Sequence, residues 1–241
     1  MLRKKRSLLS LLVLPKPVLD RWASRRAGRL AEKLSRAYMR RKLRWTEREK
    51  VRALEAAFEE TLRAALRNEN GWAKAVNILL NVGLYMLIAN RDIQSVKIDA
   101  LTHPSEWSRK VNARVVLLTI YEWDVDKVCG RDLREAMDMI RPPAELRKQV
   151  ELSLRRFRKI HGKAKKNFSP IRNTTIAHRD GNALAQYRAI KDMDTAEVLS
   201  IAGDFFGEVN RFIPLLSLLL LAGNNLDTLM RQYSAYSKTS E

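Results

Sequence analysis

Residues 143–168 of the chain read PAELRKQVELSLRRFRKIHGKAKKNF, and this stretch decides the fold class. Every third or fourth position falls on one face, which consists of Leu146, Val150, Leu154, Phe157, His161, Ala164 and Phe168. That period is typical of a helix with one face against a core. Pro143 suits the first helical position because it has no amide hydrogen to leave unpaired. We therefore predict a long helix here, with arginine and lysine dense on its outer face.

The same period recurs along most of the chain, and the alternation typical of strands is missing. With 9 glycines and 7 prolines in 241 residues, the sequence has few turn formers. The pattern predicts helices over residues 18–38, 46–68, 72–86, 111–125, 131–140 and 143–168, then a short helix from Ser169 and a long one from Asp194. Residues 90–104 are predicted to form a loop, and Thr46 with Glu49 a capping box that opens a helix. The predicted fold class is an all-α helical bundle.

Positive charge is concentrated at the N-terminus. The chain has 46 basic and 27 acidic residues, which gives a net charge of +19. Residues 1–50 hold 17 Lys and Arg against 4 Asp and Glu, a net of +13, and the remainder (29 against 23) contributes +6. We therefore predict a basic helical arm over residues 1–68 and a helical bundle over residues 69–241. Such an arm is typical of polyanion binding, most often nucleic acid, although a solvated helix that keeps the protein soluble has the same charge.

Cysteine and histidine usage indicates neither a disulfide nor a metal site. Cys129 is the only cysteine, and His103, His161 and His178 lie far apart without a paired ligand spacing. We expect no metal and no cofactor, and a location in the reducing cytoplasm. Apolar runs at residues 8–14, 75–89 and 212–222 are too short or too polar to span a bilayer. A peripheral contact of residues 1–14 with a membrane surface stays as an alternative.

One short segment has chemical promise. Residues 169–180 read SPIRNTTIAHRD, and they resemble the Arg-Asn…Ala-His-Arg-Asp segment of the HEPN superfamily, in particular its members related to abortive-infection proteins. The resemblance covers about a dozen residues, and it implies a compact helical bundle that is usually dimeric. Many members of that superfamily cut RNA without a metal, often in toxin–antitoxin or phage-defence systems. Others only bind RNA or protein, so an antitoxin or regulatory protein is a further implied partner.

The residue types fit cleavage of RNA by its own 2′-hydroxyl. The candidate catalytic residues are Arg172, Asn173 and His178. Arg172 would hold the phosphate and offset its growing charge, His178 would act as acid or base, and Asn173 would orient them. The alternative is that the segment is a tight turn with surface caps and ion pairs.

Basic residues near this segment are candidates for RNA contact. They are Arg155, Arg156, Arg158, Lys159, Lys163, Lys165, Lys166 and Arg179. Arg179 belongs to the motif itself, and the others lie on the helix before it. Those on the helix form either a phosphate track that leads to Arg172 or an ordinary charged surface. Trp22 and Trp45, set among arginines, either stack on bases or, as is commoner, seat their helix on the body.

Helix geometry limits how the motif can work. In a straight α-helix, six residues place Arg172 and His178 about 120° and roughly 9 Å apart. Both side chains can therefore contact one phosphate only in two arrangements. Either the long Arg172 side chain extends around the helix, or Arg172 of one subunit and His178 of another contribute to the same site. The family resemblance implies the second arrangement, and we predict a homodimer. Glu122, Asp124 and Asp126 are spread around a helix and favour a solvated face over a metal site, although one of them, or Asp180, could contact the motif. His161 is predicted to be at least half buried.

Overall fold

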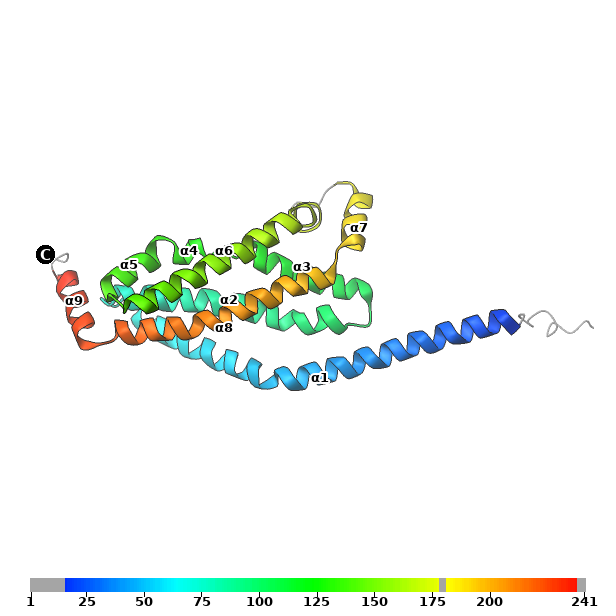
Figure 1. The fold of residues 1–241 in the computed structure, drawn as a ribbon, viewed down its shortest axis with the longest axis horizontal. Helices are drawn as coiled ribbons and strands as arrows, with labels where there is room; N and C mark the ends of the chain where they lie inside the picture. The colour runs from blue at the N-terminus through cyan, green and yellow to red at the C-terminus, as the bar shows by residue number, and fades with distance from the viewer. Residues whose placement is uncertain (1–15, 178–180, 238–241) are drawn as a thin grey trace, which may run out of the picture.

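The computed structural model describes residues 16–177 and 181–237, and over these ranges the chain forms helices and no strand (Figure 1). The predicted all-α class is therefore confirmed. The elements, in chain order, are α1 (Lys16–Asn68), α2 (Lys74–Thr102), α3 (Glu106–Glu122), α4 (Asp126–Cys129), α5 (Arg131–Ile140), α6 (Ala144–Arg172), the π-helical turn η2 (Asn173–Ala177), α7 (Ala183–Asp192), α8 (Thr195–Gly223) and α9 (Leu226–Ser237).

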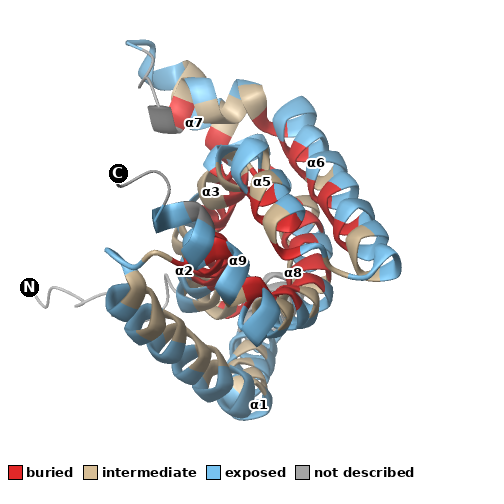
Figure 2. Cartoon of the chain, turned by 90° about the vertical axis from the view of Figure 1, so that its left-hand side faces the viewer, coloured by how far each residue is buried: buried red, intermediate tan, exposed pale blue. Residues whose placement is uncertain are grey.

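The core lies between α2, α3, α5, α6 and α8, whose buried faces turn toward one another (Figure 2). Four aromatic side chains pack at its centre. The ring centroid of Trp123 lies 4.9 Å from that of Phe157 and 5.0 Å from that of Phe205, and Phe157 is 5.9 Å from Phe212. Such edge-on and tilted pairs stabilise a core by about 0.5–1.5 kcal/mol each beyond the area they bury. The apolar face predicted for residues 143–168 is the face that α6 turns to this cluster.

The N-terminal helix α1 is one continuous helix of 53 residues, so the predicted capping box at Thr46 is wrong. The Thr46 hydroxyl donates to the carbonyl oxygens of Lys42 and Leu43, both 3.1 Å away. It therefore bonds back along a helix already formed, instead of starting a new one. Back-bonding of this kind often bends a helix, and α1 is bent near its middle (Figure 1). No described side chain of α1 is buried.

Helix α1 packs on the bundle from Arg40 onward. Arg40 and Asp99 form an ion pair with α2, and so do Glu47 and Lys97. Further along, α1 and α8 both approach α2 at Gly83, where an added Cβ would lie 3.4 Å from a methyl group of Thr61. The first half of α1 extends away from the other helices (Figure 1). The structure therefore divides the predicted arm into a packed part and a projecting part.

The predicted loop at residues 90–104 is mostly helix, because α2 runs on to Thr102. Ile93 and Ala100 are buried and continue the apolar face of α2. The polar residues between them misled the prediction, since Lys97 and Asp99 face α1 and not solvent alone. Tertiary ion pairs thus sustain a helical stretch that reads as a loop in the sequence.

Other boundaries were predicted with mixed success. The structure confirms the bounds of α5, the start of α6 at Pro143–Ala144 and the N-cap of α8 at Asp194. Asp194 Oδ1 accepts hydrogen bonds from the amides of Ala196 and Glu197. The helix predicted over residues 111–125 begins at Glu106, and α4 separates its end from Gly130. Helices α7 and α9 were not predicted; each is short and leaves most of its surface exposed.

One described helix, α8, is long and apolar enough to cross a membrane, judged by length and composition only. The core helix of a soluble protein passes the same test. In this fold α8 turns Ile201, Phe205, Val209 and Phe212 into the core against α6 and α2. Its apolar length is used, at least in part, for packing within the bundle.

Candidate functional site

Arg172 ends α6 and is held by three neighbours. Its Nε and one terminal nitrogen donate to Glu122 Oε1, at 3.0 and 2.7 Å, and the other terminal nitrogen donates to Asn173 Oδ1 at 3.1 Å. The guanidinium also lies over the ring of Tyr121, 5.2 Å from the centroid. Arg172 and Asn173, two of the candidate catalytic residues, are therefore hydrogen-bonded to each other. The contact between Glu122 and the motif, one of the alternatives weighed from the sequence, is present as well.

The helix does not restart at Ser169, so that predicted N-cap is wrong. Helix α6 continues through Pro170 to Arg172, and the Ser169 hydroxyl donates back to the carbonyl of Lys165 at 2.6 Å. Because Pro170 has no amide hydrogen, it removes one bond from the α-helical ladder, and residues Asn173–Ala177 adopt a π-helical turn. Single π turns of this kind are frequent at functional sites. The spacing of 100° per residue used for the motif does not hold across such a turn.

Three residues of the motif, His178, Arg179 and Asp180, lie outside the described residues. The described residues therefore give no distance between Arg172 and His178. The composite site of two subunits and the RNA contact of Arg179 stay predictions.

The basic face of α6 is only partly free. Three of its cations form ion pairs across the bundle: Arg158 binds Asp126 with two nitrogens, at 2.7–3.2 Å, Arg156 lies 3.8 Å from Glu208, and Lys163 lies 3.5 Å from Asp204. The remaining predicted RNA contacts on this helix have no ion pair within the described chain, namely Arg155, Lys159, Lys165 and Lys166. The predicted phosphate track is thus interrupted by carboxylates.

The acidic cluster at the end of α3 serves these ion pairs. Glu122 binds Arg172 and Asp126 binds Arg158. The hydrogen bonds from Arg158 lower the pKa of Asp126 below its usual value, against the opposing effect of partial burial. Among the described residues, no group of three or more His, Cys, Asp or Glu side chains is placed to hold a metal ion. The cluster pins the C-terminal half of α6 to α3 and α4.

Two further groups with potential chemistry are buried. His161 is 9% exposed, and its Nε2 is 2.8 Å from the carbonyl oxygen of Tyr121. The predicted burial of His161 is therefore confirmed, and its contact with Tyr121 links α6 to α3. Burial raises the pKa of the Cys129 thiol to about 12, so the thiolate that acts as nucleophile or metal ligand is not formed at neutral pH.

A second cluster of basic residues lies on the exposed side of α1, in the stretch where Arg40 and Glu47 pair with α2, and it surrounds two exposed aromatic rings. Tyr38 is 67% and Trp45 is 75% exposed. A groove of about 590 Å³ on this surface is lined by Tyr38, Arg41, Lys42, Arg44, Trp45 and Arg48. We call this set the arm patch. Within the described chain its cations carry no ion pair, except for Arg44, which is 4.0 Å from Asp99.

The commoner reading of Trp45, that it seats α1 on the body, is therefore wrong, because its ring faces solvent. Trp22 lies in a stretch whose side chains are outside the described ones. Tyr38 is the last residue of the helix predicted over residues 18–38, and no role in binding was predicted for it. The signal that distinguishes it is local: basic residues flank Tyr38 and Trp45 on the same face, where a packed stripe would have apolar neighbours.

The two clusters lie toward one end of the molecule. The C-terminal end of α6 is at the end of the bundle toward which α1 projects, and α5 and α9 are at the opposite end (Figure 1). Searches for related proteins give no further guide to this site, since no protein-family model, no curated protein and no solved structure matches the chain.

Proposed function

We propose that this protein binds single-stranded RNA through the arm patch. The observation that carries the proposal is the exposure of Tyr38 and Trp45, which are 67% and 75% exposed, beside cations of which all but Arg44 have no carboxylate partner in the described chain. Tyr38 and Trp45 are seven positions apart, about two helical turns, which places the two residues on one side of α1 with roughly 10 Å of helical rise between them. Exposed aromatic rings beside a basic groove are the usual means of holding single strands.

Charge supports a polyanion over a second copy of the arm as the partner. Residues 1–50 have a net charge of +13, so two arms placed side by side would repel each other. Arginine outnumbers lysine in this stretch, 11 to 6, and its planar fork suits phosphate and stacks on bases. Each cation that meets a phosphate releases a counterion, which is the main source of non-specific affinity.

The second part of the proposal concerns cleavage. We propose Arg172, Asn173 and His178 as a metal-independent ribonuclease site of the HEPN type, in a cytoplasmic homodimer that an antitoxin or regulatory protein could restrain. The bond between Arg172 and Asn173 and the π turn after them support this role. In the free protein Glu122 occupies the guanidinium of Arg172. A substrate phosphate must therefore displace Glu122, which would keep the site inactive until RNA is bound.

The binding proposal is tested by fluorescence anisotropy with a labelled single-stranded RNA of about 20 nucleotides. Loss of one stacking ring costs about 1–3 kcal/mol, so Trp45→Ala should weaken binding by roughly 5- to 100-fold. The matched control is Trp107→Ala, since Trp107 is also exposed but lies on the bundle, stacked on Tyr187. Equal affinities for wild type, W45A and W107A would refute a role for the arm patch.

A membrane surface is the competing partner for the same face. Leu30 and Leu34 are exposed on the side of α1 that carries Tyr38, and an amphipathic basic helix can lie on anionic lipid. Co-sedimentation with phosphatidylserine vesicles distinguishes the two partners. If W45A abolishes vesicle binding and leaves RNA binding intact, the arm patch is a lipid surface and the RNA proposal fails.

Cleavage is tested by incubating RNA with purified protein in EDTA, with wild type beside His178→Ala and Arg172→Ala. The proposal expects products with 2′,3′-cyclic phosphate ends from the wild type alone. If no RNA of a broad panel is cut while the folded variants bind RNA as well as the wild type does, the protein is a non-catalytic binding module. Light scattering then decides the dimer separately, since a monomer at micromolar concentration excludes a composite site.

A further inference from the structure

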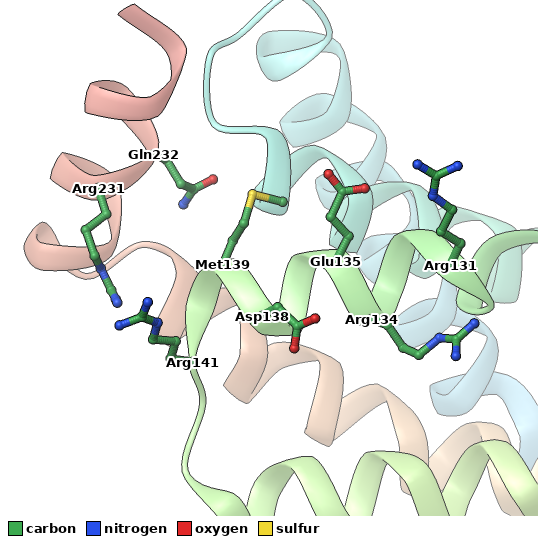
Figure 3. A pocket seen from close by; sticks show the side chains of 8 residues that line it. All are labelled: Arg131, Arg134, Glu135, Asp138, Met139, Arg141, Arg231 and Gln232. Carbon is green, nitrogen blue, oxygen red and sulfur yellow. The ribbon is translucent and has the colours of Figure 1, made fainter. Parts of the chain in front are cut away.

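A second basic pocket lies at the far end of the bundle from the arm patch, between α5 and α9 (Figures 1 and 3). Its volume is about 710 Å³, within the range of small-molecule sites, and it is lined by Arg131, Arg134, Glu135, Asp138, Met139, Arg141, Arg231 and Gln232. Four of these eight residues are arginines and none is aromatic. The lining therefore suits a compact anion better than a flat ring.

The two carboxylates of the pocket are engaged by cations that are not part of the lining. Glu135 accepts from Lys74 at 2.6 Å, and Asp138 accepts from Arg147 at 2.8 Å. The bond from Lys74 lowers the pKa of Glu135, so this carboxylate is fully ionised and satisfied at neutral pH. The arginines of the pocket are consequently left with an excess of positive charge.

Two of these arginines converge. Arg141 follows the end of α5 and Arg231 comes from α9, and their side chains point toward each other (Figure 3). Within the described chain the Arg231 side chain bonds only to its own helix, through the carbonyl of Asp227 and the hydroxyl of Thr228. The Arg141 side chain has no hydrogen bond or ion pair there, and only the backbone amide of Arg141 is bonded, to the carbonyl of Met137. Like charges that face each other without a carboxylate between them favour an anion in the space that they share.

Gln232 adds a buried donor with no partner. The residue is 5% exposed, and its Oε1 accepts from the amide of Ala75 at 3.0 Å, in the first turn of α2. That bond fixes the orientation of the amide group, because only the oxygen can accept. The Nε2 group is left buried, with no hydrogen-bond partner among the described residues, at the wall of the pocket (Figure 3). An unpaired buried donor is costly, so this one is suited to a ligand oxygen.

We propose that this pocket binds a phosphate-bearing small anion, with Gln232 Nε2, Arg141 and Arg231 as the donors. A tetrahedral oxyanion has enough acceptor oxygens to satisfy all three, and the arginine fork matches its geometry. The shared chemistry is the phosphate group, which either a free inorganic diphosphate or a nucleotide can supply. The site is separate from the arm patch and does not depend on RNA binding.

The test is isothermal titration calorimetry of the full chain with sodium pyrophosphate. The wild type should show one saturable site per chain. Gln232→Glu keeps an oxygen for the Ala75 amide but replaces the donor with an anion, and it should weaken binding at least 10-fold. Arg141→Gly removes the guanidinium at a residue with φ of 54°, a conformation that glycine adopts without strain, and it should have the same effect on a protein that stays folded.

Arg155→Gln is the matched control, because it removes one exposed arginine outside the pocket lining. No binding by the wild type at millimolar pyrophosphate, or equal weakening by R155Q and R141G, would overturn the proposal. A parallel titration with ADP identifies the source of the phosphate. Affinity for ADP at or above that for pyrophosphate assigns the pocket to nucleotides, and binding of pyrophosphate alone assigns it to the inorganic ion.

Discussion

The arm patch on α1 and the outward face of α6 are both dense in cations, but they differ in ion pairing within the described chain: three of the seven candidate cations on α6 are paired, against one of four, Arg44, in the arm patch. On α6, Arg156, Arg158 and Lys163 each face a carboxylate from α8 or α4. On α1, Arg41, Lys42 and Arg48 are exposed and have no ion pair within the described chain. A side chain that faces a neighbouring helix can meet a carboxylate from it, as Arg40 of α1 meets Asp99 of α2. A side chain that faces away from the bundle has only its own helix and solvent beside it.

This difference decides which cations can bind a polyanion. A paired arginine must give up its carboxylate before it meets a phosphate, so part of the gain is lost. A free arginine exchanges only water and small ions. Arg156, Arg158 and Lys163 therefore serve mainly to fix α6 in the bundle, whereas Arg41, Lys42 and Arg48 of α1 are available to a partner. The predictions that follow test this contrast, in order of decreasing effect.

The largest effect is expected from neutralising the free cations. The variant Arg41→Gln with Lys42→Gln and Arg48→Gln should lower the slope of log affinity against log salt for single-stranded RNA by about 2, or 0.7 for each phosphate contact. At 100 mM salt this is a loss of roughly 100-fold, or about 2.7 kcal/mol. Anisotropy titrations at several salt concentrations measure the slope.

The matched control is the triple variant of the paired cations, Arg156→Gln with Arg158→Gln and Lys163→Gln. It removes the same charge from α6 and should lower the slope by less than about 1, while reducing stability. Equal slopes for the two triple variants would show that pairing does not matter and would end the contrast between the helices.

The next effect concerns the carboxylate that holds α6 to α8. Glu208 is 1% exposed, accepts from the Ser153 hydroxyl at 2.5 Å, and lies between Arg156 and Arg211. Glu208→Ala leaves a buried hydroxyl unpaired, and we expect a loss of about 2 kcal/mol in the free energy of unfolding, since hydrogen bonds to charged groups contribute about 1.5–3 kcal/mol. Urea denaturation followed by circular dichroism measures it.

Asp204→Ala is the comparison for that variant, because it breaks the exposed ion pair with Lys163. Its cost should be at most about 0.5 kcal/mol. If D204A and E208A lower the free energy of unfolding equally, the buried bond of Glu208 contributes no more to stability than the exposed ion pair of Asp204, and the expectation is wrong.

A smaller effect is expected from acid. The hydrogen bonds from Arg158 lower the pKa of Asp126 in the folded protein. The ion pair therefore stabilises the folded protein fully at pH values above the pKa that Asp126 has in the unfolded chain. This contribution is lost as the pH falls through the lower pKa that Asp126 has in the folded protein. Because both side chains are about half exposed, screening limits the contribution to about 0.5–1 kcal/mol. The stability difference between wild type and Asp126→Asn should be constant above pH 5 and should shrink below pH 4. A difference that persists at pH 2.5 would mean that the bond is not the cause.

The smallest effect sharpens the contrast by converting a paired cation into a free one. Glu122→Gln removes the charge that faces Arg172, and the released guanidinium should raise RNA affinity by roughly 2- to 5-fold through one more phosphate contact. The same salt titrations measure the gain. Unchanged affinity would place Arg172 away from the bound RNA and weaken the proposed cleavage site.

Much of the fold could be predicted from the sequence because apolar periodicity is local. The buried face of α6 and the caps at Pro143 and Asp194 follow from residues within a turn or two of each other. The predictions that failed have a common cause. Thr46, Ser169 and residues 90–104 have polar side chains typical of helix ends or loops, but contacts with the rest of the fold, or helix continuity, outweigh these weak local preferences.

The candidate sites were less accessible to prediction. Arg172 and Asn173 were named from the motif, and their bond is between adjacent residues, so it is local too. Glu122 lies 50 residues away and reaches Arg172 only because α3 and α6 pack together. The pocket at Gln232 joins α5, α9 and the start of α2, and no spacing in the chain marks it.

By itself the sequence determined that this protein is helical, basic and charged most strongly at its N-terminus, because propensity, period and net charge are properties of neighbouring residues. Only the tertiary structure decided which charges are free. Arg41 and Arg158 each lie in an arginine-rich helical segment, yet packing sets Asp126 against Arg158 and leaves Arg41 exposed with no ion pair in the described chain. Ion pairing across a bundle depends on distances between segments far apart in the chain, and local sequence does not specify those distances.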